Sequence, residues 1–248
     1  MISKVTSKYI LSLQQKKYRY RYRTFLVEGA KSVAELLQSD FETELLLATN
    51  DFLLQNTGLI SNDIRTEIVS ETELQRLGTF ETNNSALAVA KMRSAALPQI
   101  SEESLILALD EVRDPGNLGT IIRIADWYGI RNIVCSSGCA DFYNPKVIAA
   151  SMGSFCRIHA HYFNLPHFLK ENHAATTIYA AALEGNNVYK ESLKPSGILV
   201  MGNEANGISD EVMHLAHTKL TIPRFGEAES LNVAIATAIL CDHFHRQS

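Results

Sequence analysis

Hydrophobic residues follow two different patterns along this chain, and the change between them falls at about residue 100. In the first part, short apolar runs typical of strands alternate with stretches whose apolar residues recur at helical spacing. The pattern predicts strands at 24–27, 44–48, 67–69 and 86–91, and helices at 31–38 and 71–77. This part is therefore expected to be a small α/β domain.

The second part contains nearly continuous apolar strands, most of them followed by a helical stretch. The expected strands lie at 105–109, 132–135, 178–183, 198–201 and 219–222, and the expected helices at 118–128, 145–150 and 230–244. Strands without polar alternation are typical of a parallel sheet covered by helices on both faces. Ligands bind beyond the carboxyl ends of such strands, so the loops after Leu109, Met201 and Ile222 are the candidate site.

A polar stretch that contains a proline separates the two parts. It occupies residues 93–103 and shows no apolar period, as expected of a linker. The expected domains are therefore 1–92 and 104–248.

The composition is that of an ordinary globular protein, with 46% hydrophobic and 20% charged residues in a chain of 248. No apolar run approaches the roughly 20 residues that a bilayer span needs. The amino terminus also lacks the features of a secretory signal, so a cytoplasmic protein without membrane association is expected. Neither the four cysteines nor the closely spaced histidines have metal-ligand spacing, and no metal site or disulfide framework is expected.

Basic residues are concentrated at the amino-terminal end, although the net charge is −4. Affinity for a polyanion comes from lysines and arginines that displace its counterions. Tyrosines alternate with arginines over 18–23, which would supply stacking and phosphate contacts to RNA, but the same period of two is typical of a half-buried strand. RNA is the favoured partner. The predicted RNA contacts are Lys16, Lys17, Arg19, Arg21 and Arg23.

The first candidate loop, with the helix that follows it, covers residues 110–123. Asn117 is placed to cap the helix, and Gly119 permits close approach. Arg123 falls in an otherwise apolar helical stretch, where an arginine needs an anion or another partner. A salt bridge with Asp126 or Asp110 explains Arg123 equally well.

The second candidate loop contains the sequence Gly-Asn-Glu-Ala-Asn-Gly at 202–207. Its glycines permit a tight turn built from backbone, and Ser209 is expected to cap the next helix. Glu204 is the unusual member, since its carboxylate could accept backbone hydrogen bonds or pair with Arg123.

The third candidate loop leaves the last strand at Pro223 and enters a long apolar helix that is expected to begin at Ser230. Gly226 allows a sharp excursion, and the loop could enclose a small ligand. Taken alone, this loop is better explained as an ordinary connection between a strand and a helix than as a ligand site.

Together, the order, spacing and identities of the segments 117–123, 201–207 and 222–232 resemble the three motif blocks of the SpoU (TrmH-like) RNA 2′-O-ribose methyltransferases of the SPOUT superfamily. The resemblance covers residues 105 to about 244. The basic start with Phe-Leu-Val-Glu-Gly at 25–29 resembles the substrate-binding domain that precedes the catalytic domain in many members, an α/β domain resembling ribosomal protein L30e. One departure is Ala234, where many relatives carry serine.

The resemblance implies methyl transfer from S-adenosylmethionine to a ribose 2′-hydroxyl of structured RNA, ribosomal or transfer, without a metal. It also implies that the C-terminal catalytic domain contains a deep trefoil knot and forms a homodimer. The implied catalytic residues are Arg123, Asn117, Glu204, Ser230 and Asn232. The implied cofactor-binding residues are Leu109, Met201, Gly202, Asn203, Gly207, Ile222, Pro223, Ser230 and Leu231. Because a guanidinium stays protonated, Arg123 is expected to orient the phosphate and hydroxyl, and its role as a base stays open.

Two other functions compete with this one. A non-catalytic RNA-binding protein could keep the methyltransferase fold, although the intact motif residues favour an enzyme. A different nucleotide-using α/β enzyme, such as a dehydrogenase, would need a glycine fingerprint after its first strand, and the chain has none there.

Overall fold

The computed structural model describes residues 2–80, 82–94 and 104–246, and the chain divides into two compact units. Unit 1 comprises Met1–Ser94 and Asp141–Cys156, and unit 2 comprises Ala95–Ala140 and Arg157–Ser248. The division expected from the sequence, 1–92 and 104–248, therefore differs at Asp141–Cys156, which packs with unit 1. Most of the expected linker, 95–103, lies outside the described residues.

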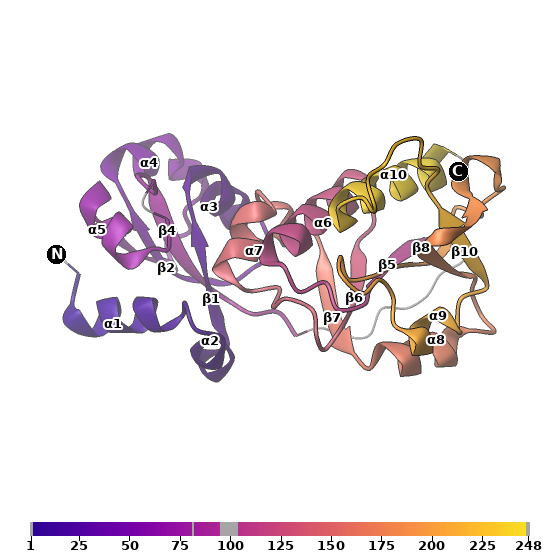
Figure 1. The fold of residues 1–248 in the computed structure, drawn as a ribbon. Coiled ribbons are helices and arrows are strands. Elements are labelled where there is room, and N and C mark those ends of the chain that lie inside the picture. The colour runs from indigo at the N-terminus through magenta and orange to yellow at the C-terminus, as the bar shows by residue number, and fades with distance from the viewer. Residues whose placement is uncertain (1, 81, 95–103, 247–248) are drawn as a thin grey trace. The chain divides into compact units, whose positions relative to one another are not determined.

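Unit 1 contains a four-stranded sheet in the order β1-β4-β2-β3 (Figure 1). Its strands are β1 Thr24–Glu28, β2 Thr43–Ala48, β3 Arg65–Ile68 and β4 Ala86–Lys91, and its helices before residue 94 are α1 Lys4–Ser12, α2 Lys16–Tyr22, α3 Ala30–Leu37, α4 Asn50–Gln55 and α5 Glu71–Leu77. β4 pairs antiparallel with β1 and β2, whereas β2 and β3 are parallel. Ile10, Leu47 and Leu74 bring α1, the sheet and α5 into one buried cluster. The expected small α/β domain is confirmed.

The tyrosine-arginine segment forms helix α2 and not the strand that its period of two also allowed. Arg19, one of the predicted RNA contacts, is completely buried within unit 1. Its Nη2 donates to Asp141 Oδ2 at 2.5 Å, and its Nη1 donates to the carbonyls of Leu13 and Gln14 at 3.0 and 2.9 Å. Arg19 therefore has a structural role within unit 1. Because it is buried, it cannot contact RNA as predicted.

The segment Asp141–Cys156 packs on the sheet of unit 1 through aromatic rings. It contains α7 Pro145–Ala150 and a short 3-10 turn, Ser154–Cys156. The ring of Tyr143 lies 4.6 Å from that of Phe25, and the ring of Phe155 lies 6.0 Å from it. These contacts add apolar burial to the Arg19–Asp141 ion pair.

Unit 2 is built on a six-stranded sheet in the order β10-β8-β9-β5-β6-β7, in which every pairing is parallel. Its strands are β5 Leu105–Leu109, β6 Asn132–Ser136, β7 His159–Phe163, β8 Ile178–Asn187, β9 Gly197–Met201 and β10 Thr218–Thr221, and its helices are α6 Pro115–Trp127, α8 Leu165–Asn172, α9 Asp210–Met213 and α10 Val233–Arg246. α6 and α10 cover one face and α8 and α9 the other (Figure 1). The expected parallel sheet covered on both faces is confirmed.

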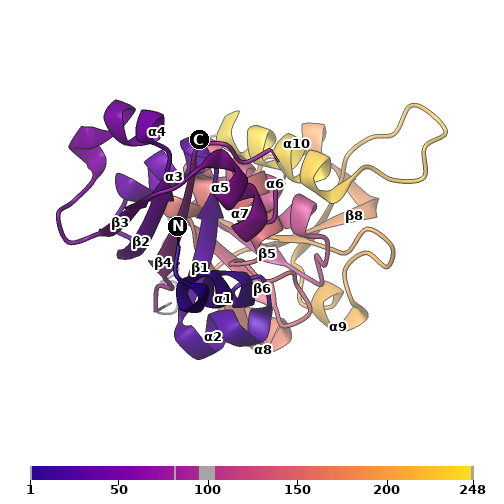
Figure 2. The same cartoon turned by 90° about the vertical axis from the view of Figure 1, so that its left-hand side faces the viewer.

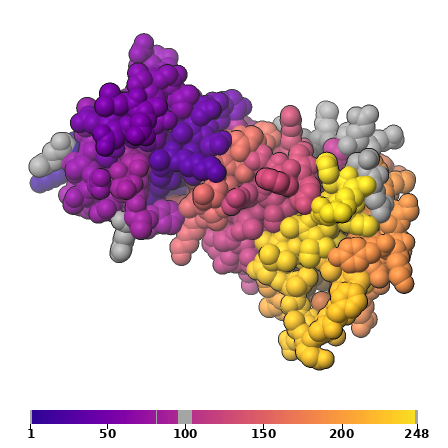
Figure 3. Space-filling model, turned by 90° about the horizontal axis from the view of Figure 1, so that it is seen from above, coloured from indigo at the N-terminus to yellow at the C-terminus, as the bar shows by residue number. Residues whose placement is uncertain are grey.

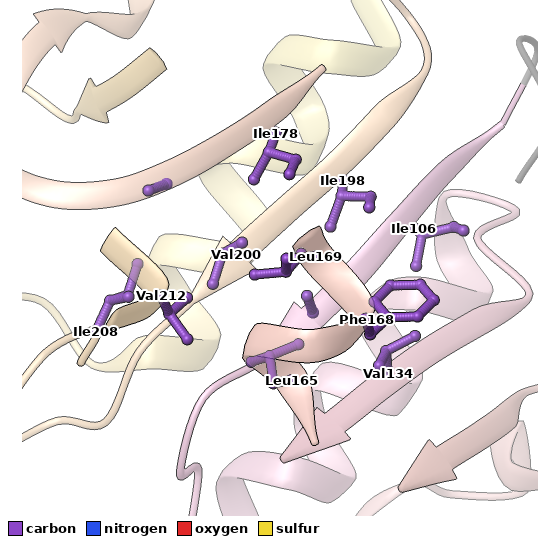
Figure 4. Packing of buried hydrophobic residues seen from close by; sticks show 12 residues of the cluster. Ile106, Val134, Leu165, Phe168, Leu169, Ile178, Ile198, Val200, Ile208 and Val212 are labelled. Atoms are coloured by element: carbon purple, nitrogen blue, oxygen red, sulfur yellow. The ribbon is translucent and has the colours of Figure 1, made fainter. Parts of the chain in front are cut away.

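The face under α8 and α9 is packed by apolar side chains (Figure 4). Leu165, Phe168 and Leu169 of α8 contact strand residues such as Ile198, and burial of each such side chain stabilises unit 2 by roughly 1.5–3 kcal/mol. On the opposite face, α10 (yellow) contributes side chains to the surface (Figure 3). Among the described residues, no helix is both long enough and apolar enough to cross a membrane.

Candidate active site

The three candidate loops follow the carboxyl ends of β5, β9 and β10, which point the same way because the strands are parallel. β5 and β9 are neighbours in the middle of the sheet. After β5 the chain adds β6 and β7 on one side of β5, and it then forms β8, β9 and β10 on the other side. Such a switch point is where ligands bind in open α/β sheets. The loop between β10 and α10 projects from unit 2 (Figure 2), and Phe225 within it is 97% exposed.

Asn117 links the three loops through its side-chain amide. Asn117 Nδ2 donates to Glu204 Oε1, in the loop after β9, and Asn117 Oδ1 accepts from Asn232 Nδ2 at 2.9 Å, in the loop after β10. The expectation that Asn117 caps α6 is wrong, because Asp114 is the capping residue and its Oδ1 accepts from the Asn117 backbone N–H at 2.8 Å. Asn117 instead lies in the first turn of α6, with its side chain committed to Glu204 and Asn232.

Asn232 also determines where α10 begins. Its Oδ1 accepts from the backbone N–H groups of Ala234 at 2.9 Å and Ile235 at 3.3 Å, which is the bonding pattern of a helix cap. The expected start of the helix at Ser230 is therefore wrong by three residues. Ser230 lies in the exposed loop, and its side chain makes no hydrogen bond to another described residue.

Arg123 is exposed on α6 and has no ion-pair or hydrogen-bond partner among the described residues. Both salt bridges that could have explained it are absent there. Asp126 pairs with Arg157 at 2.8 Å, and Asp110 accepts from Ser209. Glu204 does not pair with Arg123 either, since it accepts from Asn117. The Arg123 guanidinium is therefore available to an anion.

The loop after β9 closes on itself into a hydrogen-bonded turn. Asn203 and Gly207 exchange two backbone hydrogen bonds of 2.9 and 2.8 Å. Gly207 has a φ of +68°, which suits glycine, and a Cβ at Gly202 would lie 2.3 Å from the carbonyl carbon of Gly207. Both glycines are thus required by the backbone, as the sequence indicated.

The same turn is tied to the end of β5 through Asp110 and Glu111, neither of which was among the predicted site residues. Asp110 is 5% exposed, and its Oδ2 accepts from the Ser209 backbone N–H at 2.9 Å and from Ser209 Oγ at 2.7 Å. Ser209 stands at the capping position of α9, but its hydroxyl bonds to Asp110 and not to the helix, which corrects its expected role. Asn203 Nδ2 donates to the Glu111 carbonyl at 2.8 Å. The sequence signal was an acidic residue directly after a buried strand.

The predicted cofactor-binding residues belong to the strand ends and loops themselves, and they differ in exposure. Leu109 and Met201 are buried at the strand ends, and Ile222 and Pro223 are half-buried. Leu231 is 48% exposed. Within the described ranges, no group of three or more histidine, cysteine or acidic side chains is arranged to hold a metal ion.

The remaining predicted RNA contacts, Lys16, Lys17, Arg21 and Arg23, are exposed in unit 1. Three tyrosines interleave with them, and the Lys16 ammonium lies 5.5 Å from the ring centre of Tyr20. The Tyr20 hydroxyl donates to Asp141 Oδ1 at 3.2 Å. Burial raises the pKa of Tyr20 to about 12, and the negative charge of Asp141 adds to this, so the hydroxyl stays a donor at neutral pH.

Comparison with known proteins covers both parts of the chain. Residues 104–242 match the SpoU rRNA Methylase family, and residues 5–88 match the MRM3-like substrate binding domain. The 23S rRNA (guanosine(2553)-2′-O)-methyltransferase RlmP of Bacillus subtilis is 34% identical over 93% of this chain and 92% of its own length.

Two solved structures are similar over nearly the whole chain. A protein of the TrmH family from Porphyromonas gingivalis is 38% identical, covers 100% of both chains and superposes with a TM-score of 0.91. The AdoMet-bound rRNA methyltransferase of Sinorhizobium meliloti is 30% identical, with 99% of this chain and 97% of that chain covered and a TM-score of 0.87.

Proposed function

Because the chain belongs to the SpoU rRNA methylase family, we propose that it is a methyltransferase that moves a methyl group from S-adenosylmethionine to a ribose 2′-hydroxyl of structured RNA. The similar Bacillus protein is named for this reaction on 23S rRNA, which favours ribosomal RNA over transfer RNA as the substrate. The observation that carries the proposal is the hydrogen-bonded set Glu204–Asn117–Asn232, which joins three loops on the same unit as the unpartnered Arg123.

The loops fit the flat adenine ring of the donor. Leu231, Ile222 and Pro223 offer apolar surface beside a turn built from backbone. In this proposal the donor is held by Leu109, Met201, Gly202, Asn203, Gly207, Ile222, Pro223, Ser230 and Leu231. When bound, S-adenosylmethionine supplies an electrophilic methyl group on a sulfonium.

Arg123 is assigned to the RNA side of the reaction. A ribose hydroxyl is a poor nucleophile, so it must be held in line with the methyl group and lose its proton. The guanidinium stays charged, and it therefore orients the hydroxyl and the adjacent phosphate. Asn117 keeps one orientation because Glu204 accepts from its Nδ2 and Asn232 donates to its Oδ1. Ser230 and Asn232 complete the catalytic set.

Unit 1 is assigned to substrate recognition through α2. Lys16, Lys17, Arg21 and Arg23 are exposed, and the first three of them lie over tyrosine rings, which suits phosphate contact combined with base stacking. The match of residues 5–88 to a substrate-binding domain supports this assignment.

We further propose a cytoplasmic homodimer that forms through the catalytic domain. Trp127 on α6 is 83% exposed and Ile235 on α10 is 52% exposed, so this helical face carries apolar side chains that a second copy would cover. Sedimentation of the purified chain tests the dimer. The trefoil knot stays a prediction from family resemblance.

The deciding experiment supplies isotopically labelled methyl donor to the purified protein with unmodified ribosomal and transfer RNA. We expect label in RNA at ribose positions that then resist alkaline cleavage. Arg123→Ala should abolish transfer while calorimetry still detects donor binding. A wild-type protein that binds RNA and transfers no methyl would instead support a non-catalytic RNA-binding protein.

A further inference from the structure

The turn after β5 contains an ion pair to which the proposed methyl transfer assigns no role. Arg113 Nη2 donates to Glu111 Oε2, and the two residues flank Val112, which is completely buried. The Arg113 side chain is 63% exposed and the Glu111 side chain is 42% exposed. An ion pair this exposed contributes little to stability.

Glu111 adopts a left-handed backbone conformation, with a φ of +58°. This conformation is unfavourable for a residue with a Cβ and is found where the surroundings enforce it, often at functional sites. Here the Glu111 N–H donates to Ser136 Oγ at 2.9 Å and its carbonyl accepts from Asn203 Nδ2 at 2.8 Å. The ends of β6 and β9 therefore hold the Glu111 backbone from both sides.

The Glu111 side chain also has a defined place. It lies over Gly138, where an added Cβ would come within 2.5 Å of Glu111 Oε1. The missing side chain at position 138 leaves the space that the carboxylate occupies. From this place the carboxylate accepts from the Arg113 guanidinium and so orients it.

Arg113 therefore presents a guanidinium with unused donors. Only its Nη2 is engaged, and no other hydrogen bond joins the Arg113 side chain to the described part of the chain. A guanidinium has five N–H donors whose planar arrangement matches a phosphate. Arg113 directly precedes Asp114, the residue that caps α6, and so stands at the beginning of the helix that carries Asn117 and Arg123.

We propose that Arg113 binds a phosphate of the substrate RNA at the entrance to the site, and that Glu111 is a positioning residue that orients it. This inference rests on the proposed function, because it requires RNA to reach the loop after β5. It adds a second RNA-binding cation to the loop region, separate from Arg123 and from the basic residues of α2.

The test measures how RNA affinity depends on salt, with an unmodified transcript of large-subunit ribosomal RNA as the probe. Each lost phosphate contact lowers the slope of log affinity against log salt concentration by about 0.7 to 0.9. We expect Arg113→Ala to show this reduced slope and to bind the RNA about tenfold more weakly, the cost of one charge-assisted hydrogen bond. Affinity for S-adenosylmethionine, measured by calorimetry, should not change.

Arg131→Ala is the matched control, because Arg131 is exposed and directly precedes β6. It therefore lies at the amino ends of the strands, whereas the loops follow the carboxyl ends. This control should leave the slope unchanged, and Arg113→Lys should keep the wild-type slope with weaker binding. Glu111→Gly should weaken RNA binding without lowering Tm, because glycine tolerates the left-handed conformation. A purely structural ion pair would give the reverse, a lower Tm and unchanged RNA binding.

An unchanged slope for Arg113→Ala, in a wild-type protein that methylates RNA, would overturn this inference and leave the proposed function intact. A change in sedimentation without a change in slope would overturn it too, because Arg113 would then serve a contact between subunits. A wild-type protein that binds the transcript but transfers no methyl would contradict the proposed function, and the slope would still decide the role of Arg113.

Discussion

Asn117 and Glu204 stand 87 positions apart in the sequence and are joined by a hydrogen bond where the neighbouring strands β5 and β9 end. A carboxylate only accepts hydrogen bonds, so Glu204 must face the amide nitrogen of Asn117. The amide oxygen is then left for Asn232, which donates to it at 2.9 Å. The donor and acceptor roles of Asn117, Glu204 and Asn232 are therefore fixed as well as their positions.

Asn117→Asp reverses that polarity at nearly constant volume. The new carboxylate would face Glu204, and two negative charges would replace a hydrogen bond. We expect kcat to fall about 100-fold, as for a misplaced catalytic group, with Tm nearly unchanged. Steady-state methyl transfer measures this, with Asn62→Asp, an exposed residue of unit 1, as the control. Adding Glu204→Gln should recover part of the activity, and a double variant no better than the single one would argue against direct pairing.

Gly202→Ala tests the closed turn after β9. The added methyl would lie 2.3 Å from a backbone carbon of Gly207, so the turn must open. We expect affinity for S-adenosylmethionine to fall at least about tenfold, which is the effect of roughly 1.4 kcal/mol. Gly58→Ala is the control, since no atom lies within 4 Å of a Cβ at that position. Unchanged calorimetric affinity in Gly202→Ala would remove this turn from the donor site.

Arg19→Met should destabilise unit 1 strongly, because Asp141 would remain buried without its cation. Breaking a buried ion pair from one side costs about 3–5 kcal/mol. The double variant Arg19→Met/Asp141→Leu should lie much closer to wild type, since no buried charge is left. Urea unfolding of the full chain measures both, and Arg21→Met on the exposed side of α2 is the control. Equal free energies of unfolding for the single and double variants would show that the buried charge of Asp141 does not cause the loss of stability.

Glu28 should make stability depend on pH. Burial raises the pKa of its carboxyl group above 4.5, and hydrogen bonds from Thr79 oppose the shift without cancelling it. For an acid with a raised pKa in the folded state, the contribution to stability is present below the unfolded pKa and is lost as pH rises through the folded value.

Glu28→Gln carries no charge at any pH, so its free energy of unfolding relative to wild type should increase as pH rises from about 4.5. Denaturant unfolding at a series of pH values gives this difference. Glu71→Gln, an exposed position in the same unit, controls for the loss of one carboxylate. A difference between Glu28→Gln and wild type that stays constant with pH would contradict the raised pKa.

The sequence predicted the parallel sheet well because its central strands are buried on both faces and read as unbroken apolar runs. β5 was located to the residue. β7 was missed, since an edge strand with the sequence His-Ala-His-Tyr-Phe carries no such run. For the short helix α9 the sequence indicated only a start after Ser209 and no length, because four residues show no helical period.

Side-chain partners could not be read from the sequence, because they depend on contacts between distant positions. Arg19 looked like an RNA contact among other basic residues, but its counter-ion lies 122 positions away. For the same reason Arg123 could not be separated from a salt-bridged arginine until Asp126 and Asp110 were seen with other partners. The motif residues were predicted as a set, whereas their hydrogen-bond directions required the fold.

The placement of Asp141–Cys156 within unit 1 bears on how the protein could be cut or recombined. A fragment that stops at residue 94 would lack the counter-ion of Arg19 and the rings that cover Phe25. A graft of the remaining sequence onto another protein would carry α7 without the sheet it packs on. Unit 1 is therefore formed by two separate segments of the chain, and a single fusion point cannot transfer it to another protein. An isolated unit 1 must include residues 141–156 joined to residues 1–94.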